Sequence, residues 1–109
     1  MSDKEMFELA AKAAGIKIKG FYSDGTPFSD VNGVNEIWNP LTDDGDALRL
    51  AVKLNMHLHI DFDRPEMDVR AYTYGSDEEE SGDDPYAATR RAIVRAAAEI
   101  GKSMKEDSK

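Results

Sequence analysis

The sequence predicts an α+β fold, in which a small antiparallel sheet of three or four strands has helices packed on it, as in an alpha-beta-alpha sandwich. Three observations predict this class. Apolar residues recur every three or four positions in residues 3–14 and again in residues 85–104, which is the helical period. Residues 56–63 instead alternate between apolar and polar side chains, as a half-buried strand does. We therefore expect the order α-β-(β)-α-β-β-α.

The composition is that of one small domain. The chain has 109 residues, of which 40% are hydrophobic, and this is enough to bury a core without cross-links. It has no cysteine, so disulfides and thiolate metal sites are excluded. We expect residues 1–109 to form a single domain with a frayed tail at residues 105–109.

Nothing in the sequence indicates a membrane or a secretion route. No run approaches the roughly 18 apolar residues of a membrane-spanning helix. The start "MSDKEMF" lacks the basic residues and apolar core of a secretion signal. We therefore expect a cytoplasmic protein.

The net charge of −8 is concentrated in one segment. The run "DEEESGDD", residues 77–84, contains six acidic residues, and outside it 16 acidic residues face 14 basic ones. We interpret residues 76–84 as a flexible, solvated acidic loop. The alternative is a contact for a protein partner with a basic surface, and the candidate residues are then Asp77, Glu78, Glu79, Glu80 and Asp83. Direct binding of nucleic acid is disfavoured, because it needs clustered Lys and Arg.

The first helix has a recognisable start and end. Ser2 and Glu5 form a capping-box pattern, and Gly15 stands where a left-handed C-cap belongs. After it, the alternation around Ile16 and Ile18 indicates a strand. The turn dipeptides Asp24-Gly25 and Asn32-Gly33 follow, so we expect one or two short antiparallel strands before Trp38.

The stretch "WNPLTDDGDALRLAVKL", residues 38–54, predicts the start of a second helix. Thr42 or Asp43 is the expected N-cap, and Asp44 and Asp46 fall in the first turn. There the helix dipole favours each carboxylate by roughly 0.3–1 kcal/mol.

A calcium loop does not explain these acids, because an EF-hand needs a Glu at its twelfth position and the twelfth residue from Asp43 is Leu54. The same carboxylates would repel a phosphate.

A β-hairpin is predicted from residues 56–63 and 68–74. One face of its first strand carries His57, His59, Asp61 and Asp63. Two His at i and i+2 on a strand lie about 6–7 Å apart, close enough to share a zinc ion. Alternating polar residues are also what any half-exposed strand shows, and no further ligand is identifiable, so the metal site is the weaker alternative.

The last helix is predicted to begin at Asp84 as N-cap and Pro85 as first helical residue, and to run to about residue 104. We expect Arg90, Arg91 and Arg95 on its outer side. The acidic run lies immediately upstream and can fold back over these arginines, which we prefer to an anion-binding site.

No catalytic residue can be nominated. The chain has no cysteine, no Gly-rich phosphate loop and no serine in a nucleophile elbow.

The stretches "WNPLTDDGDALRLAVKL" and "DPYAATRRAIVRAAAEIGK" resemble a family of small phage and prophage proteins, the phage alpha-beta-alpha sandwich domain family of unknown function. The resemblance covers residues 38–60 and 84–103. Trp38, Asn39, Pro40 and Asp43 match the family motif. The resemblance implies helices on both faces of an antiparallel sheet and a phage or prophage source, but no active residues.

Two functions are therefore considered, and we prefer the first. The first is a phage or prophage accessory protein that binds a host or phage protein, for instance in counter-defence. The second is a small-ligand or metal-binding protein, such as a minor hydrolase, that uses His57, His59 and nearby carboxylates. Neither requires a cofactor, and either is compatible with a monomer or a homodimer.

Overall fold

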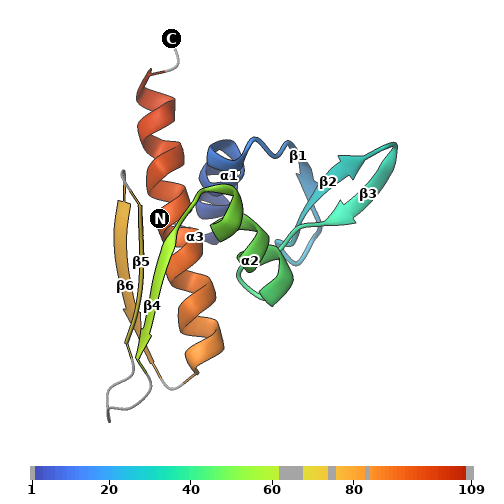
Figure 1. Cartoon of the computed structure of the whole chain (residues 1–109). Coiled ribbons are helices and arrows are strands. Elements are labelled where there is room, and N and C mark those ends of the chain that lie inside the picture. Colours follow the sequence, from blue (N-terminus) through green and yellow to red (C-terminus); the bar gives the residue numbers. More distant parts are fainter. Residues whose placement is uncertain (1, 62–67, 74–75, 83, 108–109) are drawn as a thin grey trace.

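The computed structural model describes residues 2–61, 68–73, 76–82 and 84–107. Within these ranges the chain forms three helices and two three-stranded antiparallel sheets, in the order α-βββ-α-βββ-α (Figure 1). The elements are α1 (Asp3–Ala14), β1 (Ile18–Phe21), β2 (Pro27–Val31), β3 (Val34–Ile37), α2 (Asp44–Lys53), β4 (His57–Asp61), β5 (Asp68–Thr73), β6 (Ser76–Ser81) and α3 (Pro85–Asp107). The predicted α+β class and antiparallel pairing are confirmed, although the strands divide between two sheets.

The first sheet has the order β1-β2-β3, with three strands where the sequence predicted one or two. Both predicted turns are present. Gly25 has a φ of 91°, and Asn32 and Gly33 have φ of 54° and 83°, which only turn-forming residues adopt readily. The Asp30 carboxylate accepts the N–H of Gly33 at 2.8 Å and so closes the β2–β3 hairpin.

The second sheet has the order β4-β5-β6. The predicted hairpin is formed by β4 and β5, with His57 opposite Tyr72 and Asp61 opposite Asp68. Strand β6 was not predicted: the interpretation of residues 76–84 as a flexible loop is wrong for Ser76–Ser81, which pairs with β5 along its whole length. The physical reason is that Arg70 and Arg95 neutralise the carboxylates of this segment, so its charge does not oppose an ordered strand.

The helix ends follow the sequence closely. The Ser2 hydroxyl accepts the N–H of Glu5 at 3.2 Å, and Gly15 adopts the left-handed conformation with a φ of 74°. At the start of α3 the Asp84 carboxylate accepts the N–H groups of Tyr86 and Ala87, at 3.0 and 3.3 Å. Helix α3 extends to Asp107, so part of the expected frayed tail is helical.

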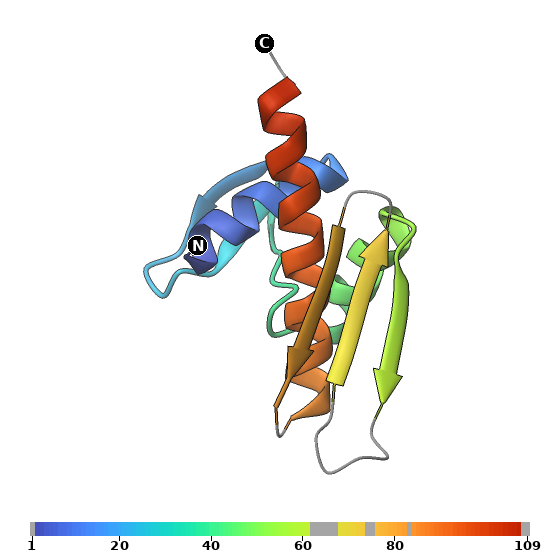
Figure 2. The same ribbon diagram turned by 90° about the vertical axis from the view of Figure 1, so that its left-hand side faces the viewer.

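Helix α3 organises the core. It packs on α1, on β5 and β6, and on α2, and in Figure 1 it lies between the β4-β5-β6 sheet and the other two helices, whereas Figure 2 shows it running down the centre of the molecule. The side chains it buries are mainly alanines, among them Ala92, Ala96 and Ala97, which allow close approach of the neighbouring elements.

The helices cover one face of the β4-β5-β6 sheet (Figure 2). Val69 and Ala71 on that face are completely buried. His59 and Arg70 on the opposite face are exposed, whereas the family resemblance implied helices on both faces. Within the described ranges, no helix is long and apolar enough to cross a membrane.

Candidate functional site

An open groove of about 1070 Å³ lies beside the residues that begin α2. It is formed by the end of α1, by strands β2 and β3, and by the first turns of α2. Its apolar lining comes from Ile16, Tyr22, Ile37 and Trp38, and its charged lining from Lys17, Asp30, Glu36, Asp46 and Arg49. The lining of the groove therefore combines apolar side chains with charges of both signs.

Trp38 connects the β1-β2-β3 sheet to helix α1 beside the groove. Its ring meets the ring of Phe7 edge-on, with 6.3 Å between centroids, and the side chain is buried. Its backbone N–H donates to the carbonyl of Pro27 at 3.0 Å. The only tryptophan of the chain thus attaches the β1-β2-β3 sheet to α1.

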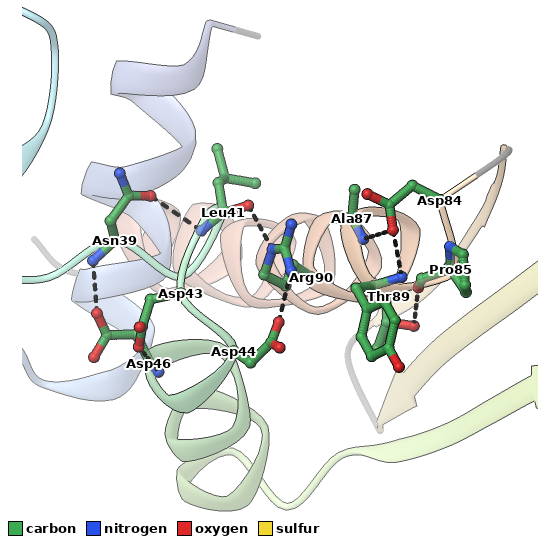
Figure 3. Close-up of polar contacts among 11 residues, drawn as sticks. Asn39, Leu41, Asp43, Asp44, Asp46, Asp84, Pro85, Ala87, Thr89 and Arg90 are labelled. Carbon is green, nitrogen blue, oxygen red and sulfur yellow. Dashed lines mark hydrogen bonds and ion pairs between the residues drawn. The ribbon is translucent and has the colours of Figure 1, made fainter.

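The aspartates after Trp38 begin α2, as predicted. Asp43 is the N-cap, and its Oδ2 accepts the N–H of Asp46 at 2.8 Å. Asp46 in turn accepts the N–H of Asn39 at 2.9 Å through Oδ2 (Figure 3). Its Oδ1 accepts a guanidinium N–H of Arg49 at 2.7 Å. Asp43 and Asp46 thus accept from donors in residues 39–49, and Asp44 pairs with Arg90 of α3, so each of the three carboxylates has a structural role.

Arg90 joins this loop to α3. Its Nε donates to the carbonyl of Leu41 at 2.8 Å and its Nη1 to Asp44 Oδ1 at 2.6 Å (Figure 3). The prediction that Arg90 lies on the outer side of the last helix is wrong, because its side chain is mostly buried against the loop before α2. A contact between residues 46 positions apart has no local sequence signal.

The charges of the groove are largely compensated. The ion pair with Asp46 raises the pKa of Arg49, and Asp43 Oδ2 lies 3.9 Å from the same guanidinium. Lys19 approaches Asp30 at 3.8 Å. This arrangement does not favour a ligand of strong net charge.

Strand β3 forms the open edge of the groove. Among the described strands it pairs only with β2, and all four of its residues are exposed. Val34 and Ile37 each keep 62% of their surface accessible to solvent. The β2–β3 hairpin projects away from the helices (Figure 1). The sequence indicated the turn at Asn32-Gly33 but not that all four residues of β3 would be exposed.

The candidate metal ligands His57, His59 and Asp61 belong to β4, which lies on the opposite side of the molecule from the β2–β3 hairpin (Figure 1). The His57 ring stacks on Tyr72, with 5.0 Å between centroids and 9° between planes. His59 stands opposite the cationic Arg70 in the strand register. Within the described ranges, no three His, Asp or Glu side chains come together as metal ligands around His57, His59 and Asp61, and Asp63 falls outside these ranges.

The acidic residues of β6 contact the chain's own arginines. Arg70 donates to Asp77 through two nitrogens at 2.8 and 2.6 Å, and this interaction lowers the pKa of Asp77. Arg95 pairs with Glu78 at 3.2 Å and with Glu80, and the Glu80 contact raises the pKa of Arg95. The expectation that the acidic run neutralises the last helix is thus confirmed for Arg95.

Two partner-binding candidates of the acidic run remain. Glu79 is exposed and stands opposite Arg70 in the strand register. Asp83 lies outside the described residues.

No protein-family model, curated protein or solved structure matches this chain. The likeness of residues 38–60 and 84–103 to phage proteins therefore remains a hypothesis.

Proposed function

We propose that this chain is a binding protein that captures an extended segment of a partner protein along the free edge of β3. The observation that carries this proposal is that all four residues of β3 are exposed, with Val34 and Ile37 each 62% accessible. An edge strand presents unpaired backbone N–H and C=O groups, which an added strand can satisfy. Strand addition of this kind is a recurrent mode of peptide recognition.

The neighbouring groove supplies side-chain selectivity for such a segment. Ile37 of β3 lines it, and Tyr22 and Trp38 form the rest of its aromatic and apolar lining together with Ile16. Alternate residues of an added strand point to the same side, so every second side chain of the partner would enter the groove. An apolar residue at these positions matches the lining best.

The acidic strand β6 is less suited to be the primary partner surface. Asp77, Glu78 and Glu80 already contact Arg70 and Arg95 of the same chain. A basic partner would have to displace these intramolecular pairs, and the new surface ion pairs would add little because solvent screens them. We therefore assign partner binding to the β2–β3 hairpin and not to the acidic strand.

The biological setting is proposed from the sequence resemblance. A phage or prophage accessory protein acts in the cytoplasm of the bacterial host, where a small binding protein can occupy a host protein, as in counter-defence. A groove with no recognised catalytic set fits this role better than a hydrolase.

The proposal is tested by affinity capture from bacterial lysate with the immobilised full chain. Ile37→Lys places a charge at the β3 edge, whereas Val52→Lys places the same charge on α2, where the wild-type side chain is 71% exposed. We expect proteins captured by the wild type to be retained by Val52→Lys and lost by Ile37→Lys. In the purified complex, backbone amides of Val34–Ile37 should gain protection from hydrogen exchange.

A third variant separates the two surfaces. Glu79→Lys reverses an exposed charge of β6 and leaves the hairpin intact. If partners are lost with Glu79→Lys and kept with Ile37→Lys, the acidic strand and not the hairpin is the binding surface, and the proposal is wrong.

A further inference from the structure

The two edges of the β4-β5-β6 sheet differ in charge. Strand β6 carries four consecutive acidic residues, Asp77 to Glu80, of which Asp77 and Glu79 are exposed. Like charges along an edge oppose the addition of an identical strand, which is a common protection against edge-to-edge association. Strand β4, at the other edge, has the sequence His-Leu-His-Ile-Asp, with one acid and neither lysine nor proline. Only one edge of this sheet is therefore protected.

Strand β4 also exposes apolar side chains that belong to the covered face of the sheet. Leu58 stands opposite Ala71 and Ile60 opposite Val69 in the register, so the four side chains point to the same face. Val69 and Ala71 are completely buried, whereas Leu58 and Ile60 remain 37% and 43% exposed. The layer formed by α3 thus covers β5 and leaves β4 with an uncovered apolar border.

The side chains of β4 are complementary to those of a second, antiparallel copy of the same strand. If two copies of β4 pair antiparallel about His59, then Leu58 of one copy faces Ile60 of the other, and His57 faces Asp61. The apolar pair lies on the face of Val69 and Ala71. An imidazole opposite a carboxylate provides complementary charge or a hydrogen bond on the outer face. Both alternating faces of the strand therefore match a second copy.

We propose that β4 is a homodimer interface, at which a second copy of this chain adds its own β4 antiparallel with His59 on the two-fold axis. The result is a continuous six-stranded sheet with α3 of both copies on the same face. Strand β6 then forms both outer edges, where its carboxylates stop further growth. This inference involves the other sheet and does not depend on the partner-binding role of the β2–β3 hairpin.

The absence of cysteine from the natural chain makes the register directly testable. In the proposed dimer, position 59 faces itself across the axis at a Cα separation of about 4.5–5.5 Å, within the range for a disulfide. Position 57 instead faces position 61 of the second copy, so the two copies of position 57 are separated by four residues, or about 13 Å along the strand. We expect His59→Cys to form a disulfide-linked dimer with oxidised glutathione, while His57→Cys and the β6 control Glu79→Cys remain uncrosslinked on non-reducing gels.

The assembly itself is measured by sedimentation equilibrium across the micromolar range. The wild type should be a dimer, and Ile60→Lys should be a monomer with unchanged far-UV circular dichroism, because a charge at the border opposes pairing. Val34→Lys, on the hairpin, should leave the dimer intact. A monomeric wild type, or crosslinking of His57→Cys as fast as His59→Cys, would overturn the inference while leaving the hairpin proposal untouched.

Discussion

At the scale of single residues, Asp43 determines where α2 begins. Its carboxylate accepts the N–H of Asp46, one of the first helical donors that have no partner within the helix. Thr42 was an equally good candidate in the sequence, and the backbone conformation of Asp43, extended at φ −114° and ψ 118°, identifies it as the cap.

We predict that Asp43→Ala lowers the free energy of unfolding by about 1 kcal/mol, the usual cost of losing such a cap. Thr42→Ala is the matched control and should change stability by less than half as much. Urea denaturation of the two variants measures both effects. Equal losses would show that the two side chains share the capping role.

The ion pair between Arg70 and Asp77 gives a prediction of pH dependence. The hydrogen bond from Arg70 lowers the pKa of Asp77 below its ordinary value of 3.8. A depressed carboxyl pKa adds stability above the unfolded-state value, and this contribution is lost as the pH falls through the folded-state value. We expect Arg70→Gln to return the pKa of Asp77 toward 3.8 in an NMR titration.

The same variant should lose stability at neutral pH and none at a pH below the folded-state pKa of Asp77. The effect is expected to be small and to shrink with added salt, because both side chains are exposed. An unchanged titration of Asp77 in Arg70→Gln would mean that another group depresses its pKa.

At the scale of elements, the crossing of α1 and α3 depends on Gly101. A Cβ at this position would overlap the backbone carbonyl of Leu9, whose carbon would be 2.7 Å away. The carbonyl belongs to an ordered helix and cannot move aside cheaply, so the two helices approach this closely only because Gly101 has no side chain. Periodicity alone predicts no special role for a glycine inside a helix.

We predict that Gly101→Ala destabilises the protein by about 1–3 kcal/mol through overpacking. This sign is opposite to the gain of about 1 kcal/mol that Gly→Ala gives in an exposed helix. Lys102→Ala, at the exposed neighbouring position, is the control and should be nearly neutral. Thermal and urea unfolding test the difference, and a more stable Gly101→Ala protein would contradict this packing.

At the scale of the whole molecule, one core connects both sheets. Trp38, Leu50, Val69 and Val94 belong to a single cluster of buried residues, which extends from the β1-β2-β3 sheet through the helices to β5. No described part of the structure has a core of its own. Unfolding is therefore expected to be cooperative.

Trp38 reports directly on this expectation, because it is the only tryptophan and lies where the first sheet meets α1. We predict that its fluorescence and the far-UV circular dichroism of the helices give the same urea midpoint. An earlier fluorescence transition would show that the β1-β2-β3 sheet detaches before α3 unfolds.

Much of the local structure was predictable from residues close together in the chain. The caps at Ser2, Asp43 and Asp84 each bond an N–H two or three residues ahead, and the β4–β5 hairpin alternates with period two. The start of α2 at the edge of the groove was predictable for the same reason. The groove itself was not, because it lies between elements whose relative placement has no local signal.

The sequence by itself determined the α+β class, the three helices with their caps and the two turns of the first sheet, because these depend on interactions within a few residues. Only the tertiary structure decided that the acidic run is a strand, that Arg90 holds the α2 loop and that the strands form two sheets. Those outcomes depend on distant partners, such as Arg95 for Glu80, 15 residues away, and Asp44 and Leu41 for Arg90, 46 and 49 residues away. A run of acidic residues does not show which arginines will neutralise it or whether it will form the edge strand of a sheet. Its conformation depends on the partners that folding places beside it, and these are distant in the sequence.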